Sequence, residues 1–329
     1  MVSDASILAA AQTQLPLVRQ PFHALARSIG ASPRRVMRLL RDAQRDGRVR
    51  RIGGIFEARA MGYCSALLAM DVEDIVSAGQ VLAMHPGTSH VYERLGPSRY
   101  SLWATLAVST GSSLGLDDTV RRLAELAGAS DVQILPAIKR YKLDARFGPS
   151  RPPAPADRPA RPHTLTDTDR TLVRLLQRPL PITSRPFDPL ARKMHIDTSA
   201  FLSHARSLRS DGVLRRVSAI ANHRLLGATM NVMAVWSLTG RDADRAGVIC
   251  SASPSVSHCF LRRTWPTWPY GFYAMIHGSS QRDCRDTIEE LSERFGAHEG
   301  LALWTGREFK KSPVAFFDPD ERAWERTNG

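Results

Sequence analysis

The chain has 329 residues, a formal net charge of +13, and globular shares of hydrophobic (43%) and charged (23%) residues. This composition excludes a disordered, collagen-like or coiled-coil protein, and no run approaches the roughly 20 apolar residues of a membrane-spanning helix. The first residues do not resemble a signal peptide, and the four cysteines form no C-x-x-C pair. We therefore expect a cytoplasmic protein without structural zinc. The charge predicts a polyanionic partner, either nucleic acid or a carboxylate- or phosphate-rich ligand.

The first elements in chain order are helical. Apolar residues recur at helical spacing over 3–14, and a short helix is predicted over 21–29. Ser32 then caps a second helix that begins with Pro33. This spacing predicts a helix-turn-helix, followed by a strand over 49–56.

After residue 62 the hydrophobic pattern alternates between stretches typical of strands and stretches typical of helices. We predict a strand over 63–72 and a helix over 76–87, followed by a hairpin of two strands, 89–95 and 100–108, joined by GPSR. A helix over 117–129 and a final strand over 131–143 complete the unit. The order β-α-β-β-α-β is that of a ferredoxin-like fold with its helices on one face of the sheet. A segment rich in Pro and Arg over 144–164 reads as a linker.

The sequence contains this unit twice, as a tandem repeat. The 48 residues from Leu15 align without a gap to those from Leu180, with 15 identities. SHVYER from Ser89 matches SHCFLR from Ser257, and Asp197 takes the capping place of Ser32. The prediction is an α+β tandem duplication with helix-turn-helix domains over 1–62 and 165–227 and ferredoxin-like domains over 63–143 and 228–329.

Each copy carries a row of His, aromatic and Arg on one predicted strand. Alternation along a strand places His90, Tyr92 and Arg94 on one face, and His258, Phe260 and Arg262 on one face of the second copy. A helix-covered face would bury these charges at high cost, so we expect both rows on the open sheet face. If the two copies pair as a pseudo-dimer within the chain, that face becomes a central cavity. The alternative is a row of interface residues whose polar groups are already satisfied.

These stretches resemble a known family. A winged helix-turn-helix followed by such an α/β unit resembles the Lrp/AsnC regulators. More specifically, RRIGGIFEARAMGY, SHVYER and YSLW resemble one subunit of siroheme decarboxylases, and VSHCFLRRTWPTWPYGFYAMIHG resembles the partner subunit. The chain departs from the family pattern at a few positions, namely Val91, Ser101, Phe260 and Gly271.

The resemblance implies removal of carbon dioxide from two acetate side chains of siroheme, giving 12,18-didecarboxysiroheme for d1-type or alternative haem biosynthesis. It implies no cofactor beyond the iron tetrapyrrole substrate. Siroheme is rich in carboxylates, and arginine binds a carboxylate through paired hydrogen bonds while histidine donates protons near neutral pH. Siroheme is thus the expected partner; further homologous subunits and a homodimer stay open, and no membrane partner is expected.

These considerations select the candidate site residues. Proton donors are His90, His258 and His223, and His223 is also a candidate axial ligand of the substrate iron. The candidate substrate-binding residues are Arg94, Arg262, Arg50, Arg51, Arg215, Arg216, Tyr92, Tyr100, Trp103, Trp268, Tyr270 and His277. For His277, packing at a strand end is the competing interpretation, and for the four paired arginines it is a surface position on a wing.

The alternative function is a DNA-binding regulator of the Lrp/AsnC type, including one that senses a tetrapyrrole. The first helix-turn-helix favours it, because arginines follow one another along the second helix, at Arg34, Arg35, Arg38, Arg41 and Arg45. The second helix-turn-helix weakens it, since Ser199, Ala200, Ser203 and His204 suit neither phosphates nor base edges.

Overall fold

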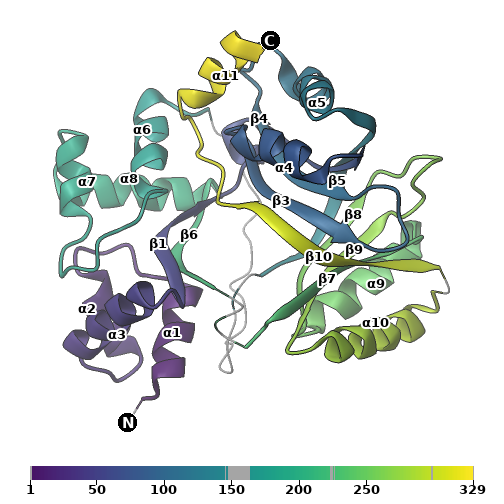
Figure 1. The fold of residues 1–329 in the computed structure, drawn as a ribbon. Coiled ribbons are helices and arrows are strands. Elements are labelled where there is room, and N and C mark those ends of the chain that lie inside the picture. Colours follow the sequence, from purple (N-terminus) through teal and green to yellow (C-terminus); the bar gives the residue numbers. More distant parts are fainter. Residues whose placement is uncertain are drawn as a thin grey trace. The chain divides into compact units, whose positions relative to one another are not determined.

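The computed structural model describes residues 2–144, 146, 164–222, 225, 227–297 and 299–328. They separate into two compact units, each of which combines corresponding segments of both sequence copies. We call residues 1–61 and 145–227 the helix-turn-helix unit, and residues 62–144 and 228–329 the barrel unit (Figure 1).

The helix-turn-helix unit repeats one pattern twice. Its elements in copy one are α1 (Asp4–Thr13), α2 (Pro21–Ser28), α3 (Pro33–Arg45), β1 (Val49–Phe56) and the short 3-10 helix η1 (Arg59–Met61). Those in copy two are α6 (Asp167–Leu176), α7 (Asp188–Lys193), α8 (Thr198–Ser210) and β6 (Leu214–Ala221). The two strands pair antiparallel. The predicted caps are confirmed, since the Ser32 hydroxyl accepts from the Arg35 amide and the Asp197 carboxylate from two amides of α8.

His204 on α8 is used inside the fold. Its Nε2 atom lies 2.5 Å from Oδ1 of Asp169, a buried residue of α6. Burial opposes ionisation of Asp169, but hydrogen bonds from His204 and Thr166 outweigh it and lower the pKa of the carboxyl to about 2. In the second helix-turn-helix, His204 of α8 therefore points toward α6 and contacts Asp169 there.

The contact between Asp169 and His204 predicts that the free energy of unfolding falls at acid pH. Because the folded pKa of Asp169 lies below its unfolded value, the stabilisation is present above about pH 4 and is lost as pH falls toward 2. Asp169→Asn is expected to lower the free energy of unfolding by about 1–2 kcal/mol at neutral pH and to flatten its pH dependence below 4. Denaturant titrations between pH 2 and 7 check this, with the exposed Asp167→Asn as the control. Equal losses in both variants would contradict it.

The barrel unit contains the two predicted β-α-β-β-α-β repeats. Copy one has β2 (Tyr63–Val72), α4 (Ile75–Met84), β3 (Thr88–Leu95), β4 (Leu102–Ser109), α5 (Gly115–Leu126) and β5 (Ala129–Leu143). Copy two has β7 (Met230–Trp236), α9 (Gly240–Ala252), β8 (Val256–Arg262), β9 (Phe272–Gly278), α10 (Gln281–Phe295) and β10 (Gly300–Lys311).

The two sheets join into one closed barrel. The strand order β3-β4-β2-β5 of copy one is matched by β8-β9-β7-β10 of copy two. The last strand of each copy pairs antiparallel with the second strand of the other copy, as β5 with β8 and β10 with β3. This reciprocal pairing gives the pseudo-dimer its two-fold character and leaves one inner and one outer face.

The helices cover the outer face. One buried cluster joins α4 and α5 to copy-one strands, and a second joins α9 and α10 to copy-two strands. A third cluster contains residues of strands and loops from both copies and no helix residue, so it lies on the inner face of the barrel. The prediction that the helices lie on one face of each sheet is confirmed.

The C-terminal helix α11 (Asp320–Asn328) has no counterpart among the described residues of copy one and was not predicted. Its Glu321 carboxylate accepts from the Ser109 amide at 2.8 Å, and Glu325 accepts from Ser113 in the loop after β4. The Trp324 ring meets His85 edge-on, with 4.3 Å between ring centroids. Burial lowers the pKa of His85 to about 4, so this histidine packs as a neutral ring.

Candidate active site

Both His–aromatic–Arg rows face the inside of the barrel. Val91 and Cys259 lie within the two helix-covered clusters. Since side chains alternate along a strand, Tyr92 and Phe260 beside them point to the opposite, inner face. The prediction that each row shares one face away from the helices agrees with this placement.

In copy one the three side chains of the row contact one another. The His90 and Tyr92 rings stack with 6.1 Å between centroids, and the Arg94 guanidinium lies 5.2 Å from the centre of the Tyr92 ring. The Tyr92 hydroxyl donates to Glu308 on β10 at 3.3 Å. His90 is exposed and Arg94 is buried, so the row runs from solvent into the barrel.

Arg94 is a buried cation without a counter-ion among the described residues. It is 6% exposed, and its Nη1 atom donates to the Thr305 hydroxyl at 2.5 Å. That hydroxyl in turn donates to the Asn231 side chain, while the Arg94 Nε atom has no hydrogen-bond partner in the described part of the chain. Burial lowers the pKa of Arg94 to about 10, which keeps it protonated at neutral pH. A buried cation of this kind suits an anionic ligand.

The copy-two row is built differently. The Arg262 guanidinium lies over the rings of Phe260 and Tyr273, at 4.8 and 5.4 Å from their centres. Its Nη1 atom donates to the main-chain oxygen of Leu135 at 2.8 Å. The two pseudo-equivalent arginines therefore have unlike surroundings: hydroxyl and amide side chains for Arg94, aromatic rings and a carbonyl for Arg262.

A β-bulge precedes each histidine. The register of β3 with β4 skips Ser89, and that of β8 with β9 skips Ser257. A bulge breaks the strict alternation of side chains, so two neighbouring residues can approach each other. Accordingly, the serine hydroxyl shares a hydrogen bond with Nδ1 of the next histidine, at 2.9 Å for His90 and 2.7 Å for His258.

His277 joins the copy-two site. Its Nε2 atom lies 2.7 Å from the Ser257 hydroxyl, so one hydroxyl connects His277 and His258. His277 lies on β9 opposite Asn231 of β7, the residue that accepts from Thr305. The inner wall of copy two therefore carries a polar series from Thr305 to His258, in which His277 is a member rather than an isolated strand-end residue.

The other aromatic candidates form packed core instead of an open cavity. Tyr100, Trp103 and Trp268 are between 1% and 3% exposed, and Trp268 contacts both others edge-on within 5.5 Å. Trp268 comes from the loop after β8, and half-buried Tyr270 packs against its ring at 5.0 Å. The expected central cavity is thus wrong for this part of the inner face, because an aromatic loop of copy two fills it.

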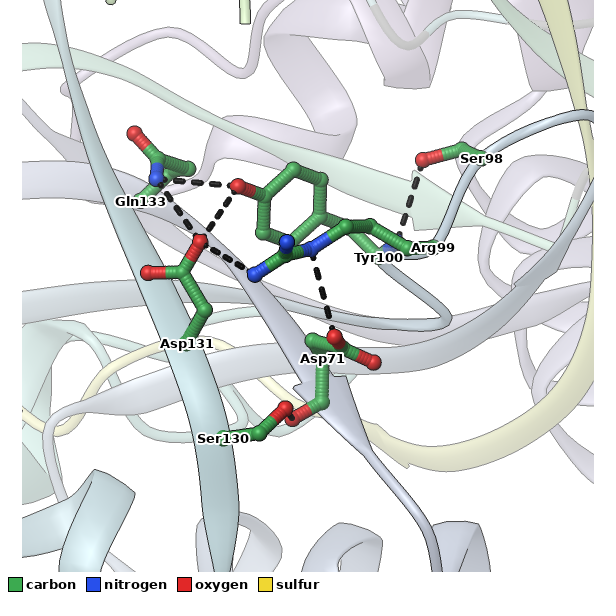
Figure 2. A network of polar contacts seen from close by, with 7 residues as sticks. All are labelled: Asp71, Ser98, Arg99, Tyr100, Ser130, Asp131 and Gln133. Carbon is green, nitrogen blue, oxygen red and sulfur yellow. Dashed lines mark hydrogen bonds and ion pairs between the residues drawn. The ribbon is translucent and has the colours of Figure 1, made fainter. Parts of the chain in front are cut away.

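A polar network holds Tyr100 in this core (Figure 2). Its hydroxyl donates to Asp131 at 2.7 Å and accepts from Gln133 at 2.9 Å, while Arg99 pairs with Asp131 and Asp71. Burial and the bond to Asp131 raise the pKa of Tyr100. The hydroxyl is already hydrogen-bonded within the protein, so Tyr100 supports the wall of the site.

The bond between Trp268 and Tyr273 gives a stability prediction. The Trp268 indole donates to the Tyr273 hydroxyl at 2.6 Å, and both side chains are 3% exposed. Tyr273→Phe leaves a buried indole N–H unsatisfied and is expected to lower the free energy of unfolding by about 1–2 kcal/mol. Chemical denaturation measures it, with Tyr270→Phe as the control at a partly exposed ring. A loss no larger than that of the control would count against the contact.

Four further arginine candidates belong to the helix-turn-helix unit. Arg51 donates to the carbonyl of Gln177 at the end of α6, and burial lowers its pKa. Arg50 is exposed, and Arg215 and Arg216 are partly buried on β6. Arg51 therefore has a structural contact at a helix end, where a cation is favourable. His223 lies outside the described residues.

No group of three or more His, Cys, Asp or Glu side chains in the described ranges is arranged to hold a metal ion. None of the helices described is both long and apolar enough to cross a membrane.

Sequence reasoning missed the residues that surround the two rows. Two of them are Ser89 and Ser257, which contact the histidines. The other three are Asn231, Thr305 and Glu308, on strands β7 and β10 of copy two. A signal for the serines was available, because Ser-His is kept in both SHVYER and SHCFLR. The other three required knowledge of how β10 pairs with β3.

Comparisons with known proteins agree with this architecture. An AsnC-like ligand-binding domain matches residues 60–142 and 225–310, and a siroheme decarboxylase NirDL-like helix-turn-helix domain matches 4–50 and 169–215. A siroheme decarboxylase of Hydrogenobacter thermophilus is 30% identical over 323 residues, covering 97% of this chain and 96% of that protein. A siroheme decarboxylase NirDL subunit of Paracoccus denitrificans is 30% identical over 292 residues, covering 87% and 88%.

Solved structures match over the same length. The crystal structure of the siroheme decarboxylase NirDL superposes with a TM-score of 0.78 at 29% identity, covering 99% of this chain and 98% of that one. A second structure of NirDL, in complex with an iron-uroporphyrin III analogue, gives the same TM-score and covers 97% and 96%. The duplicated fold predicted from the sequence is confirmed by these matches.

Proposed function

Because the chain belongs to the siroheme decarboxylase family, we propose that it removes carbon dioxide from two acetate side chains of siroheme. The product would be 12,18-didecarboxysiroheme, which serves d1-type haem formation or an alternative haem route. The relatives with this activity cover nearly the full length of the chain, and one related structure holds an iron tetrapyrrole.

One observation carries the assignment to this site. Arg94 is a buried, protonated guanidinium on the inner face of the barrel, with no counter-charge among the described residues and with Nε unbonded there. An acetate or propionate carboxylate of the substrate would supply the missing charge and acceptor. Arg262 is its counterpart on the other half, and the +13 charge of the chain suits a substrate with many carboxylates.

The chemistry requires a carboxylate holder and an acid. Breaking the C–C bond releases carbon dioxide and leaves an electron pair on the methylene carbon, which the conjugated ring delocalises. A proton must then reach that carbon, and the product side chain is a methyl group. We assign this proton to His90 for one acetate and His258 for the other. Their bonds to Ser89 and Ser257 at Nδ1 orient the rings so that Nε2 acts as the donor.

Tyr92 would position the ring of the substrate by stacking, and the packed aromatic core would support the wall behind it. His223 stays a candidate acid or axial ligand of the substrate iron, and Arg50, Arg51, Arg215 and Arg216 stay candidate carboxylate ligands. The two halves of the barrel would serve as the pseudo-dimer in which both reactions occur.

Anaerobic incubation of the purified chain with siroheme, followed by mass spectrometry, tests the proposal. We expect two successive losses of carbon dioxide. A halt after the first loss would show that a homologous subunit is required. Siroheme that binds and keeps its mass would contradict the enzymatic function, as would the absence of binding.

A further inference from the structure

The hydroxyl of Ser257 connects two histidines. It lies 2.7 Å from Nδ1 of His258 and 2.7 Å from Nε2 of His277, and its third contact, the Met275 carbonyl oxygen, is longer at 3.4 Å. A hydroxyl has one proton to donate and can accept at the same time. Ser257 can therefore donate to one imidazole while accepting from the other, and it can exchange these roles by rotating its hydroxyl.

Copy one lacks the second histidine. Ala107 holds the position of His277, since its amide donates to the Gly87 carbonyl as the amide of His277 donates to Ser255, both at 2.9 Å. In copy one, His90 pairs with Thr105 on the neighbouring strand, and Ala107 comes two positions later. In copy two, His258 pairs with Met275, and His277 comes two positions later. The bulge and the Ser–His bond are thus duplicated, whereas the histidine pair belongs to copy two alone.

Exposure gives a reason for the difference. His90 is exposed, so water can return a proton to it after each reaction. His258 is only partly exposed, and Ser257 is 1% exposed. His277 is also partly exposed and can exchange protons with solvent, and the buried Ser257 hydroxyl connects it to His258.

We propose that Ser257 and His277 form a proton relay that supplies His258 during the decarboxylation at the copy-two half of the barrel. This inference rests on the proposed function, in which His258 is the acid for one acetate. It assigns His277 a role as proton reservoir instead of substrate ligand, and Ser257 the role of a positioning and relay residue.

The proton transfers balance. Before the step His277 is an imidazolium, and neutral His258 carries its proton on Nε2. The C–C bond breaks, carbon dioxide leaves, and the Nε2 proton of His258 moves to the methylene carbon. The hydroxyl proton of Ser257 moves to Nδ1 of His258, and the Nε2 proton of His277 replaces it on the serine oxygen. Both histidines end neutral and protonated on Nδ1, and no oxidant or reductant is consumed.

His277→Gln is the decisive variant. The glutamine amide can still hydrogen-bond to Ser257 but cannot hold an additional proton. We expect this variant to slow one of the two decarboxylations at least about tenfold with little change in KM, as loss of proton supply to a general acid predicts. The monodecarboxylated product that accumulates should be the same isomer that His258→Ala accumulates, and a different isomer from that of His90→Ala.

Ser257 provides the matched comparison. Ser257→Ala is expected to slow the same step, and Ser257→Thr, which keeps the hydroxyl, to restore most of the rate. Imidazole nitrogen NMR of the ligand-free protein reports the ring tautomers without any turnover. Ser257→Ala should change the nitrogen signals of both His258 and His277 and leave those of His90 unchanged, whereas Ser89→Ala should change those of His90 only.

The outcomes separate the two hypotheses. A wild-type chain that leaves siroheme unchanged would overturn the proposed function and the relay with it. An active wild type with a fully active His277→Gln variant would overturn the relay alone. So would His258 and His277 signals that do not respond to Ser257→Ala.

Discussion

Arg94→Gln is expected to lower kcat/KM for siroheme by about a hundredfold, which corresponds to a loss of about 3 kcal/mol of binding in the transition state. The reason is that Arg94 is a buried cation whose one side-chain acceptor among the described residues is the Thr305 hydroxyl. Its guanidinium can still offer Nε and further N–H groups to a carboxylate.

The same substitution is expected to leave the ligand-free protein as stable as the wild type, or to stabilise it. A buried charge without a counter-ion costs free energy, and glutamine removes that charge while keeping a donor for Thr305. Thermal unfolding without ligand and steady-state kinetics are the two measurements. Arg121→Gln, on the exposed side of α5 in a pair with Asp118, is the control for a simple loss of charge. A large drop in stability with unchanged kinetics would show that Arg94 is structural.

The histidines should divide the two reactions between them. His90→Ala and His258→Ala are each expected to stop after one loss of carbon dioxide, and the double variant to lose activity by about a thousandfold or more. Mass spectrometry of timed samples distinguishes the two monodecarboxylated products. If both single variants complete both reactions at the wild-type rate, neither histidine is the acid.

Much of the fold follows from local sequence signals. The Ser32 and Asp197 caps begin the second helix of each helix-turn-helix. Alternation along β3 and β8 places Tyr92 and Phe260 on the face opposite Val91 and Cys259, which lie in the helix-covered clusters. The repeat itself predicted that two copies would pair. The caps and the strand faces depend on neighbours within a few residues, and the repeat is visible as similarity between two long segments, which is why the sequence expresses them.

The remainder depends on contacts between distant residues. Closure of the barrel pairs β10 with β3, a register that no local pattern specifies, and it brings Thr305 to Arg94. The bulges at Ser89 and Ser257 lie just before the two rows and interrupt the alternation there, which no local pattern specifies. The aromatic loop around Trp268 was expected to line a cavity, but its large apolar rings bury themselves against Tyr100 and Trp103.

The reciprocal strand pairing has a consequence for how the two copies evolve. A copy on its own would expose two unpaired strand edges, which would accept any partner with a matching edge, including an identical copy. Covalent connection raises the effective concentration of the unlike copy to about the millimolar range and so favours the mixed barrel. Substitutions that differ between the halves, such as His277 against Ala107, then always meet in a fixed one-to-one ratio. Fusion thereby allows the two halves to diverge, as the proposed assignment of one acetate to each half requires, without a need to select mixed over matched dimers.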